Sequence, residues 1–265
     1  MPRFLSHRGL PLARIGLAIL ALLLAWCLLI PAPAALCLSH DQLAVRADAL
    51  YEQRGDLGKA GQAVEYYRRL VADDPADLEA SLRLCELLIW LGAQSSDEKG
   101  EELFREVIVV AQQARRAHPK EPGPLFYLGT GQGLLADVAS PPEALMLVKQ
   151  AQKNMAKLMK SQPDYYHGGP DRVLGRIYTK MPWFIGGDND LAEQHYKRAI
   201  HYGPRYWLNQ LYLAELYYKQ GKDDQARRLL EQVAQGKPMP TLLPECRLWQ
   251  QVARKALANG GPPPN

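Results

Sequence analysis

The chain has 265 residues, of which 47% are hydrophobic and 23% charged, and its formal net charge is +4. Three arginines near the start supply most of that charge, and subtracting them leaves +1 for the rest of the chain. This balance, without an arginine-rich run interleaved with aromatic residues, does not favour a nucleic-acid partner. The composition agrees with one soluble domain behind a targeting segment.

Residues 1–40 are predicted to be a signal peptide or a membrane anchor. Arg3, Arg8 and Arg14 precede residues 15–30, which contain no polar side chain, and small residues follow them. A basic region, an apolar region and a small-residue cleavage zone are typical of a secretory signal. The apolar stretch is slightly short for a membrane span, yet a retained anchor stays open. In both cases we expect the remaining chain to be exported to the periplasm or the cell envelope.

A lipid anchor at Cys37 is a third way to attach the chain to a membrane. A lipoprotein signal requires a small residue directly before the modified cysteine. Leu36 stands at that position, and leucine is not small. The sequence therefore argues against lipidation of Cys37.

Residues 41–258 are predicted to form helical hairpins. Pro204 and Pro238 lie 34 residues apart, and the residues between them follow the order large apolar, small, aromatic, turn glycine, small. Small residues let two antiparallel helices approach closely, and glycine supplies the left-handed backbone that ends the first helix. A unit of this length and pattern is typical of the tetratricopeptide repeat, or TPR. The residues in question are Leu213, Ala214, Tyr217, Gly221 and Ala226.

The same pattern recurs upstream, where Pro75, Pro119, Pro163 and Pro204 follow one another at 44, 44 and 41 residues. We expect the excess residues to lie in the turns, because lengthening a surface turn costs little free energy. The predicted fold is all-α, an α–α superhelix of about five TPR-like hairpins plus a C-terminal capping helix. The Gly- and Pro-rich residues 259–265 are predicted to be a disordered tail. The predicted helices are 41–54 with 60–73, 77–92 with 97–117, 123–138 with 141–161, 169–180 with 188–202, 205–220 with 223–235, and a last helix at 244–258.

The sequence contains no catalytic motif such as a Gly-x-Ser-x-Gly elbow or a His-Glu-x-x-His zinc motif. The histidines are scattered, so we expect no metal site. Cys85 and Cys246 lie several hairpins apart and are predicted to be separate apolar core residues rather than a disulfide. The chain is therefore predicted to be a protein without enzymatic activity or cofactor.

The run Gly129-Thr130-Gly131-Gln132-Gly133 falls in the middle of a predicted helix. Each glycine weakens a helix by ~1 kcal/mol relative to alanine, which suggests a purpose. The run indicates close helix packing or, alternatively, a widened groove or pocket beside Gly131. In TPR proteins the first helix of each hairpin lines the concave surface, and Tyr218 is a second candidate for that groove.

Three cations at Arg172, Arg176 and Lys180 are spaced to share one face of a predicted helix. If that face points into the concave groove, carboxylates or phosphates of a ligand can pair with the cations. A solvated cationic face is the alternative. The insert that follows holds Trp183 and Phe184, which either fold back on the neighbouring hairpin or contact a ligand or partner.

The stretch Gly168-Gly169-Pro170, Val173-Leu174-Gly175-Arg176-Ile177-Tyr178, Pro182 and Gly186-Gly187-Asp188 resembles the T-component proteins of tripartite ATP-independent periplasmic (TRAP) transporters. The resemblance implies a periplasmic helical-repeat protein with a pocket or channel through its middle. It also implies contact with the extracytoplasmic solute-binding subunit. Members are commonly lipoproteins, and the residues before Cys37 depart from that pattern.

Two non-catalytic functions remain open at this point. The chain is predicted to be an accessory component of solute uptake that binds a partner protein, with a small apolar or anionic ligand as a further expectation. The alternative is a general cell-envelope scaffold for secretion, pilus or cell-wall assembly. Membrane association through the N-terminal segment and formation of an oligomer both stay open.

Overall fold

The computed structural model describes residues 38–262, and the helical unit begins at His40. Residues 1–37 of the predicted leader (1–40), including Cys37, and residues 263–265 of the predicted tail lie outside the described residues. Between 38 and 262 the chain forms eleven α-helices and two short 3-10 turns, with no strand. The prediction of an all-α fold is confirmed.

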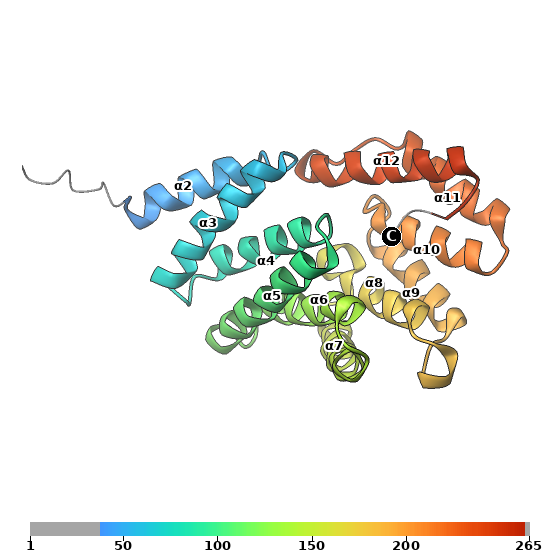
Figure 1. Ribbon diagram of the computed structural model, residues 1–265, viewed down its shortest axis with the longest axis horizontal. Coiled ribbons are helices and arrows are strands. Elements are labelled where there is room, and N and C mark those ends of the chain that lie inside the picture. The colour runs from blue at the N-terminus through green and yellow to red at the C-terminus, as the bar shows by residue number, and fades with distance from the viewer. Residues whose placement is uncertain (1–37, 263–265) are drawn as a thin grey trace, which may run out of the picture. The chain divides into compact units, whose positions relative to one another are not determined.

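The helices pair in the predicted order, and each hairpin packs against the next (Figure 1). A final helix covers the last hairpin and buries Cys246, Trp249 and Ala253. The hairpins are α2 (His40–Tyr51) with α3 (Leu57–Asp73), α4 (Leu78–Gly92) with α5 (Asp97–Ala117), α6 (Pro122–Val138) with α7 (Pro141–Ser161), α8 (Tyr165–Lys180) with α9 (Asn189–Tyr202), and α10 (Leu208–Lys219) with α11 (Asp223–Gln235). The final helix is α12 (Leu243–Asn259), and the 3-10 turns are η1 (Trp183–Ile185) and η2 (Pro240–Leu242).

The expectation that the excess residues lie in the turns is wrong for two hairpins. Helices α5 and α7 each contain 21 residues, whereas α11 contains 13. Lengthening a helix adds a backbone hydrogen bond for each residue and extends its amphipathic face, so the added residues are stabilised. Between α8 and α9, in contrast, the excess residues do form a long turn.

Small residues bring the helices of a hairpin together as predicted. Ala214 and Ala226 are fully buried between α10 and α11, beside the buried Tyr217. Gly221 ends α10 in the left-handed conformation, with φ of +69°. Between α8 and α9, a Cβ added to Gly175 would lie 2.6 Å from the ring of Tyr196, so only glycine allows this approach.

The first hairpin also meets the start of α12, although the two are far apart in sequence. Figure 1 shows the turn between α2 and α3 beside the beginning of α12. Arg54 in that turn bonds Glu245 and the backbone of Thr241. Among residues 38–262 no helix is long and apolar enough to cross a membrane.

Candidate functional site

A cavity of about 400 Å³ lies on the inner side of the helical unit. Its walls come from the first helices of four hairpins, α4, α6, α8 and α10, together with the start of α7. Most of the lining is apolar, as Leu134, Val148 and Ile177 illustrate. A largely apolar cavity with a few polar groups is the usual form of a small-molecule site.

The three predicted cations, Arg172, Arg176 and Lys180, all line this cavity. Arg172 is only 5% exposed, and its guanidinium lies 4.3 Å from the centre of the Tyr206 ring. It donates to the side-chain oxygen of Asn209 at 3.2 Å and to the carbonyl of Tyr166 at 3.4 Å. The contacts of Arg172 are therefore mainly with other residues of the protein.

Arg176 is also engaged by the protein. It pairs with Glu215 of α10 and lies 4.7 Å from the centre of the Tyr212 ring. Lys180, one turn further along α8, is exposed at the edge of the cavity. Burial and the neighbouring Arg176 lower the pKa of the Lys180 amine below its usual value. Of the three cations, Lys180 is the most exposed to solvent.

The start of α8 has an uncommon backbone conformation. Tyr166, His167 and Gly168 have φ values of 46°, 60° and 75°, so the regular helix begins only after Gly168, close to the predicted start. A non-glycine residue in the left-handed conformation costs about 1–3 kcal/mol of folding free energy, and it persists only where surrounding contacts stabilise it. Here Asn209 donates to the carbonyl of His167 at 3.1 Å and to that of Ala199 at 2.9 Å. The turn places Tyr166 in the cavity wall.

Two carboxylates in the cavity wall, those of Glu86 and Asp137, were not predicted from the sequence. Glu86 of α4 accepts hydrogen bonds from Tyr51 at 2.6 Å and Tyr127 at 2.7 Å, which joins three hairpins. Burial raises the pKa of the Asp137 carboxyl above its usual value, and the nearby Arg176 opposes that rise. Neither residue belongs to a motif, and each meets its neighbours only through the fold.

The glycine run divides between packing and the cavity. A Cβ on Gly131 would lie 2.8 Å from Val107, so this glycine packs α6 against α5 and lies outside the cavity. Thr130 and Gly133 do line the cavity. The buried hydroxyl of Thr130 has no hydrogen-bond partner among the described residues. Tyr218 packs, half-buried, on the core of the last hairpins and is not part of the wall.

The aromatic insert does not fold back on the neighbouring hairpin. Trp183 is 85% exposed and Phe184 69%, and neither lines the cavity, whereas Ile185 does. The amide of Gly187 bonds the carbonyl of Pro182, and Gly186 has φ of 110°. These features close a tight loop that directs the two aromatic rings into solvent.

The remaining chemistry of the described part is simple. Cys85 and Cys246 are both buried and free, as predicted. Across residues 38–262, no cluster of three or more His, Cys, Asp or Glu side chains could hold a metal ion.

Comparisons with known proteins agree with this architecture. The TPR protein TTC0263 of Thermus thermophilus superposes with a TM-score of 0.61 at 19% identity, over 84% of this chain and 98% of that one. PilF of Pseudomonas aeruginosa gives a TM-score of 0.46 at 18% identity, over 82% of this chain and 90% of that one. The first likeness shows a shared TPR fold, and no curated protein matches the sequence.

A family model described as TAtT, TRAP transporter T-component, matches residues 91–258, which is more than half of the sequence. That stretch includes the α8–α9 hairpin on which the sequence resemblance rested. The chain belongs to the TRAP transporter T-component family.

Proposed function

We propose that the chain is a non-catalytic, exported accessory component of solute uptake that binds a partner protein and takes a small ligand into its cavity. The observation that carries this proposal is the cavity itself. Its volume of about 400 Å³ lies within the range of small-molecule sites, and its wall is mostly apolar. Family membership supports the transport role, and the predicted leader supports export.

The ligand that fits this wall has an apolar body and a polar or anionic end. The apolar walls of α6, α7 and α8 would cover the body. The amine of Lys180 would meet the polar end. Ordinary hydrogen bonding and charge pairing then fix the orientation of the ligand.

Filling the cavity tests this proposal. A Cβ on Gly133 would have its nearest neighbour at 3.7 Å, on Val173, so a leucine side chain there enters the cavity without a clash at its base. We expect Gly133→Leu to weaken binding of the apolar anion anilinonaphthalene sulfonate by about tenfold or more, measured by fluorescence titration. Gly61→Leu is the matched control, because a Cβ there meets nothing within 4 Å and the residue lies outside the cavity.

Equal binding by both leucine variants, or no binding by the unmodified protein, would contradict a ligand role. Circular dichroism distinguishes loss of the cavity from loss of the fold. Leucine has a higher helix propensity than glycine, so neither variant should lose helix.

The partner is an extracytoplasmic solute-binding protein, and the exposed loop at the cavity edge is its contact. Trp183 and Phe184 stand next to Met181, Pro182 and Ile185, which line the cavity. Exposed aromatic residues are enriched at protein interfaces. Binding there would join the cavity to the binding cleft of the partner.

Biolayer interferometry with a purified solute-binding subunit of the same transport system tests the contact. We expect Trp183→Ser with Phe184→Ser to weaken binding about tenfold or more, as truncation of aromatic anchors does. The control is Val45→Ser, a 69% exposed apolar residue on α2. Absence of binding by the unmodified protein would favour the general envelope scaffold instead.

A further inference from the structure

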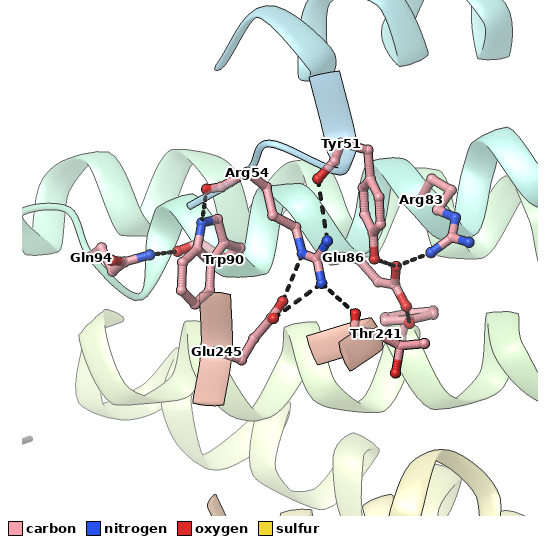
Figure 2. Close-up of polar contacts among 9 residues, drawn as sticks. Tyr51, Arg54, Arg83, Glu86, Trp90, Gln94, Thr241 and Glu245 are labelled. Atoms are coloured by element: carbon pink, nitrogen blue, oxygen red, sulfur yellow. Dashed lines mark hydrogen bonds and ion pairs between the residues drawn. The ribbon is translucent and has the colours of Figure 1, made fainter. Parts of the chain in front are cut away.

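Arg54 joins two parts of the chain that are 191 residues apart. It lies in the turn between α2 and α3 and is 2% exposed. Its Nε donates to Glu245 Oε1 at 2.8 Å, and its Nη2 donates to Glu245 Oε2 at 3.0 Å (Figure 2). This two-pronged geometry is the strongest form of an ion pair between side chains.

Two further donors of Arg54 bond backbone carbonyls. Its Nη2 reaches the carbonyl of Thr241 at 2.9 Å, and its Nη1 reaches the carbonyl of Tyr51 at 3.2 Å. The indole of Trp90 donates to the carbonyl of Arg54 at 2.8 Å, which fixes the turn against α4. Burial lowers the pKa of the guanidinium, but the bonds and charge of Glu245 outweigh it and hold that pKa above the usual value.

Such a closure is uncommon in a helical-repeat protein. Each repeat normally contacts only its neighbours, so the two ends of the array are independent. Consecutive helices pack extensively on one another here. Among the described helices, α3 and α12 do not pack on each other to a comparable extent. The two ends meet mainly through Arg54 and the adjoining contact of Gly55 with Pro244. We call this contact, formed by Arg54, Gly55, Thr241, Pro244 and Glu245, the seam.

Each side of the seam keeps its own core. Trp249, Ala253 and Ala256 of α12 are buried within the core of the last hairpins. Leu43, Ala47 and Tyr51 are the buried face of α2, which packs on α3. Separating the seam would therefore expose an ion pair to water while both hydrophobic cores stay closed, and hydration offsets much of the loss of a charged pair.

The seam does not line the cavity, but residues near it on both sides contact the cavity wall. On one side, Tyr51 bonds Glu86, which lines the cavity. On the other, the Trp249 ring lies 4.7 Å from the ring of Tyr206, which also lines it. Movement of either end would shift a wall of the cavity.

We propose that the seam is a latch, which opens to let a ligand pass and is closed by the pairing of Arg54 with Glu245. This inference rests on the ligand role proposed for the cavity and adds how access to it is controlled. The pair suits such a task because it is compact, reversible and specific in geometry, whereas an apolar interface would resist separation.

A disulfide across the seam tests the latch. A Cβ on Gly55 would lie 3.4 Å from Cβ of Pro244, close to the mean of about 3.8 Å in disulfides. We expect the oxidised full-length Gly55→Cys, Pro244→Cys protein to bind and release anilinonaphthalene sulfonate at rates reduced about tenfold or more in stopped-flow fluorescence, at unchanged equilibrium affinity. Reduction should restore the rates, and each single cysteine variant under oxidation is the control.

Equal rates in the oxidised and reduced forms would overturn the latch and make the seam a fixed staple, with the ligand role intact. A different failure, no dye binding by the reduced or unmodified protein, would count against the ligand role. The two outcomes are thus distinguishable.

A second measurement needs no ligand. Spin labels at the exposed Gln53 and Arg247 report the separation of the two ends by pulsed electron resonance. We expect Glu245→Gln, which keeps the shape and removes the charge, to add a population at longer distance. Glu143→Gln is the control, since it removes the charge from an exposed pair with Arg105 elsewhere. A single, unchanged short distance in Glu245→Gln would overturn the proposal.

Discussion

The last two hairpins share one repeat pattern but differ in structure. In α10–α11, Ala214 and Tyr217 form a regular hairpin that closes at the left-handed Gly221. In α8–α9, the matching positions are Gly175 and Tyr178, but the hairpin starts with a left-handed turn and a long exposed loop joins its two helices. Both hairpins supply cavity wall through their first helices, but only the irregular one carries strongly exposed aromatic residues in its loop. The departures from the repeat thus fall in the hairpin to which we assign the partner contact.

The left-handed turn is the costliest departure, and Asn209 holds it. Asn209 is fully buried, donates to the carbonyls of His167 and Ala199, and accepts from Arg172. We expect Asn209→Ala to lower the free energy of unfolding by about 3 kcal/mol, because several buried polar groups lose their partner. Urea unfolding measures the effect, with Gln94→Ala as a control at an exposed side chain–backbone bond. A loss no larger than in that control would show that the turn needs no such brace.

The next largest loss of stability is expected from exchanging the small residues at matching positions of the two hairpins. Gly175→Ala would place a methyl group 2.6 Å from the buried Tyr196 ring and should cost about 2 kcal/mol by overpacking. Ala214→Gly should cost about 1 kcal/mol through helix propensity. Thermal unfolding followed by circular dichroism compares them. If Gly175→Ala is neutral or stabilising, the two hairpins do not differ in how closely their helices approach.

The turn should also make stability depend on pH. Burial, and then the charge of Arg172, lower the pKa of His167 below 6.5. The unfolded chain therefore binds a proton more readily than the folded one, so stability is full above pH 6.5 and falls as pH drops toward the folded pKa. We expect His167→Asn to flatten this decline, since asparagine tolerates the left-handed backbone. Parallel profiles of the free energy of unfolding against pH for both proteins would contradict the assignment.

The smallest effect on stability is expected at the exposed loop. Trp183→Ser should change the free energy of unfolding by less than about 0.5 kcal/mol, because the side chain is 85% exposed. Chemical denaturation measures this. A large loss would mean that the ring packs on the protein in solution, and the loop would then be unsuited to contact a partner.

Much of the fold is predictable from local signals in the sequence. The bounds of α5, α7 and α11 agree with the predicted ranges, because proline, glycine and the helical period mark them independently of the rest of the chain. The left-handed glycine at Gly221 is predictable for the same reason.

The cavity is only partly predictable. Spacing alone places Arg172, Arg176 and Lys180 on one face, and all three line the cavity. Spacing cannot show that Asn209 and Glu215 already engage two of them, because those partners come from α10. The pairing of Arg54 with Glu245 depends on the curvature summed over every hairpin, which no short window of sequence contains.

The family match starts near the end of α4, at residue 91. Glu86 and Ile89 of the cavity wall, together with Arg54, lie before that point. A chimera that grafted residues 91–258 onto another leader would carry the α8–α9 hairpin and α12, yet it would lack one wall of the cavity and the cation that pairs with Glu245. Residues 91–258 by themselves therefore do not contain all the residues that line the cavity.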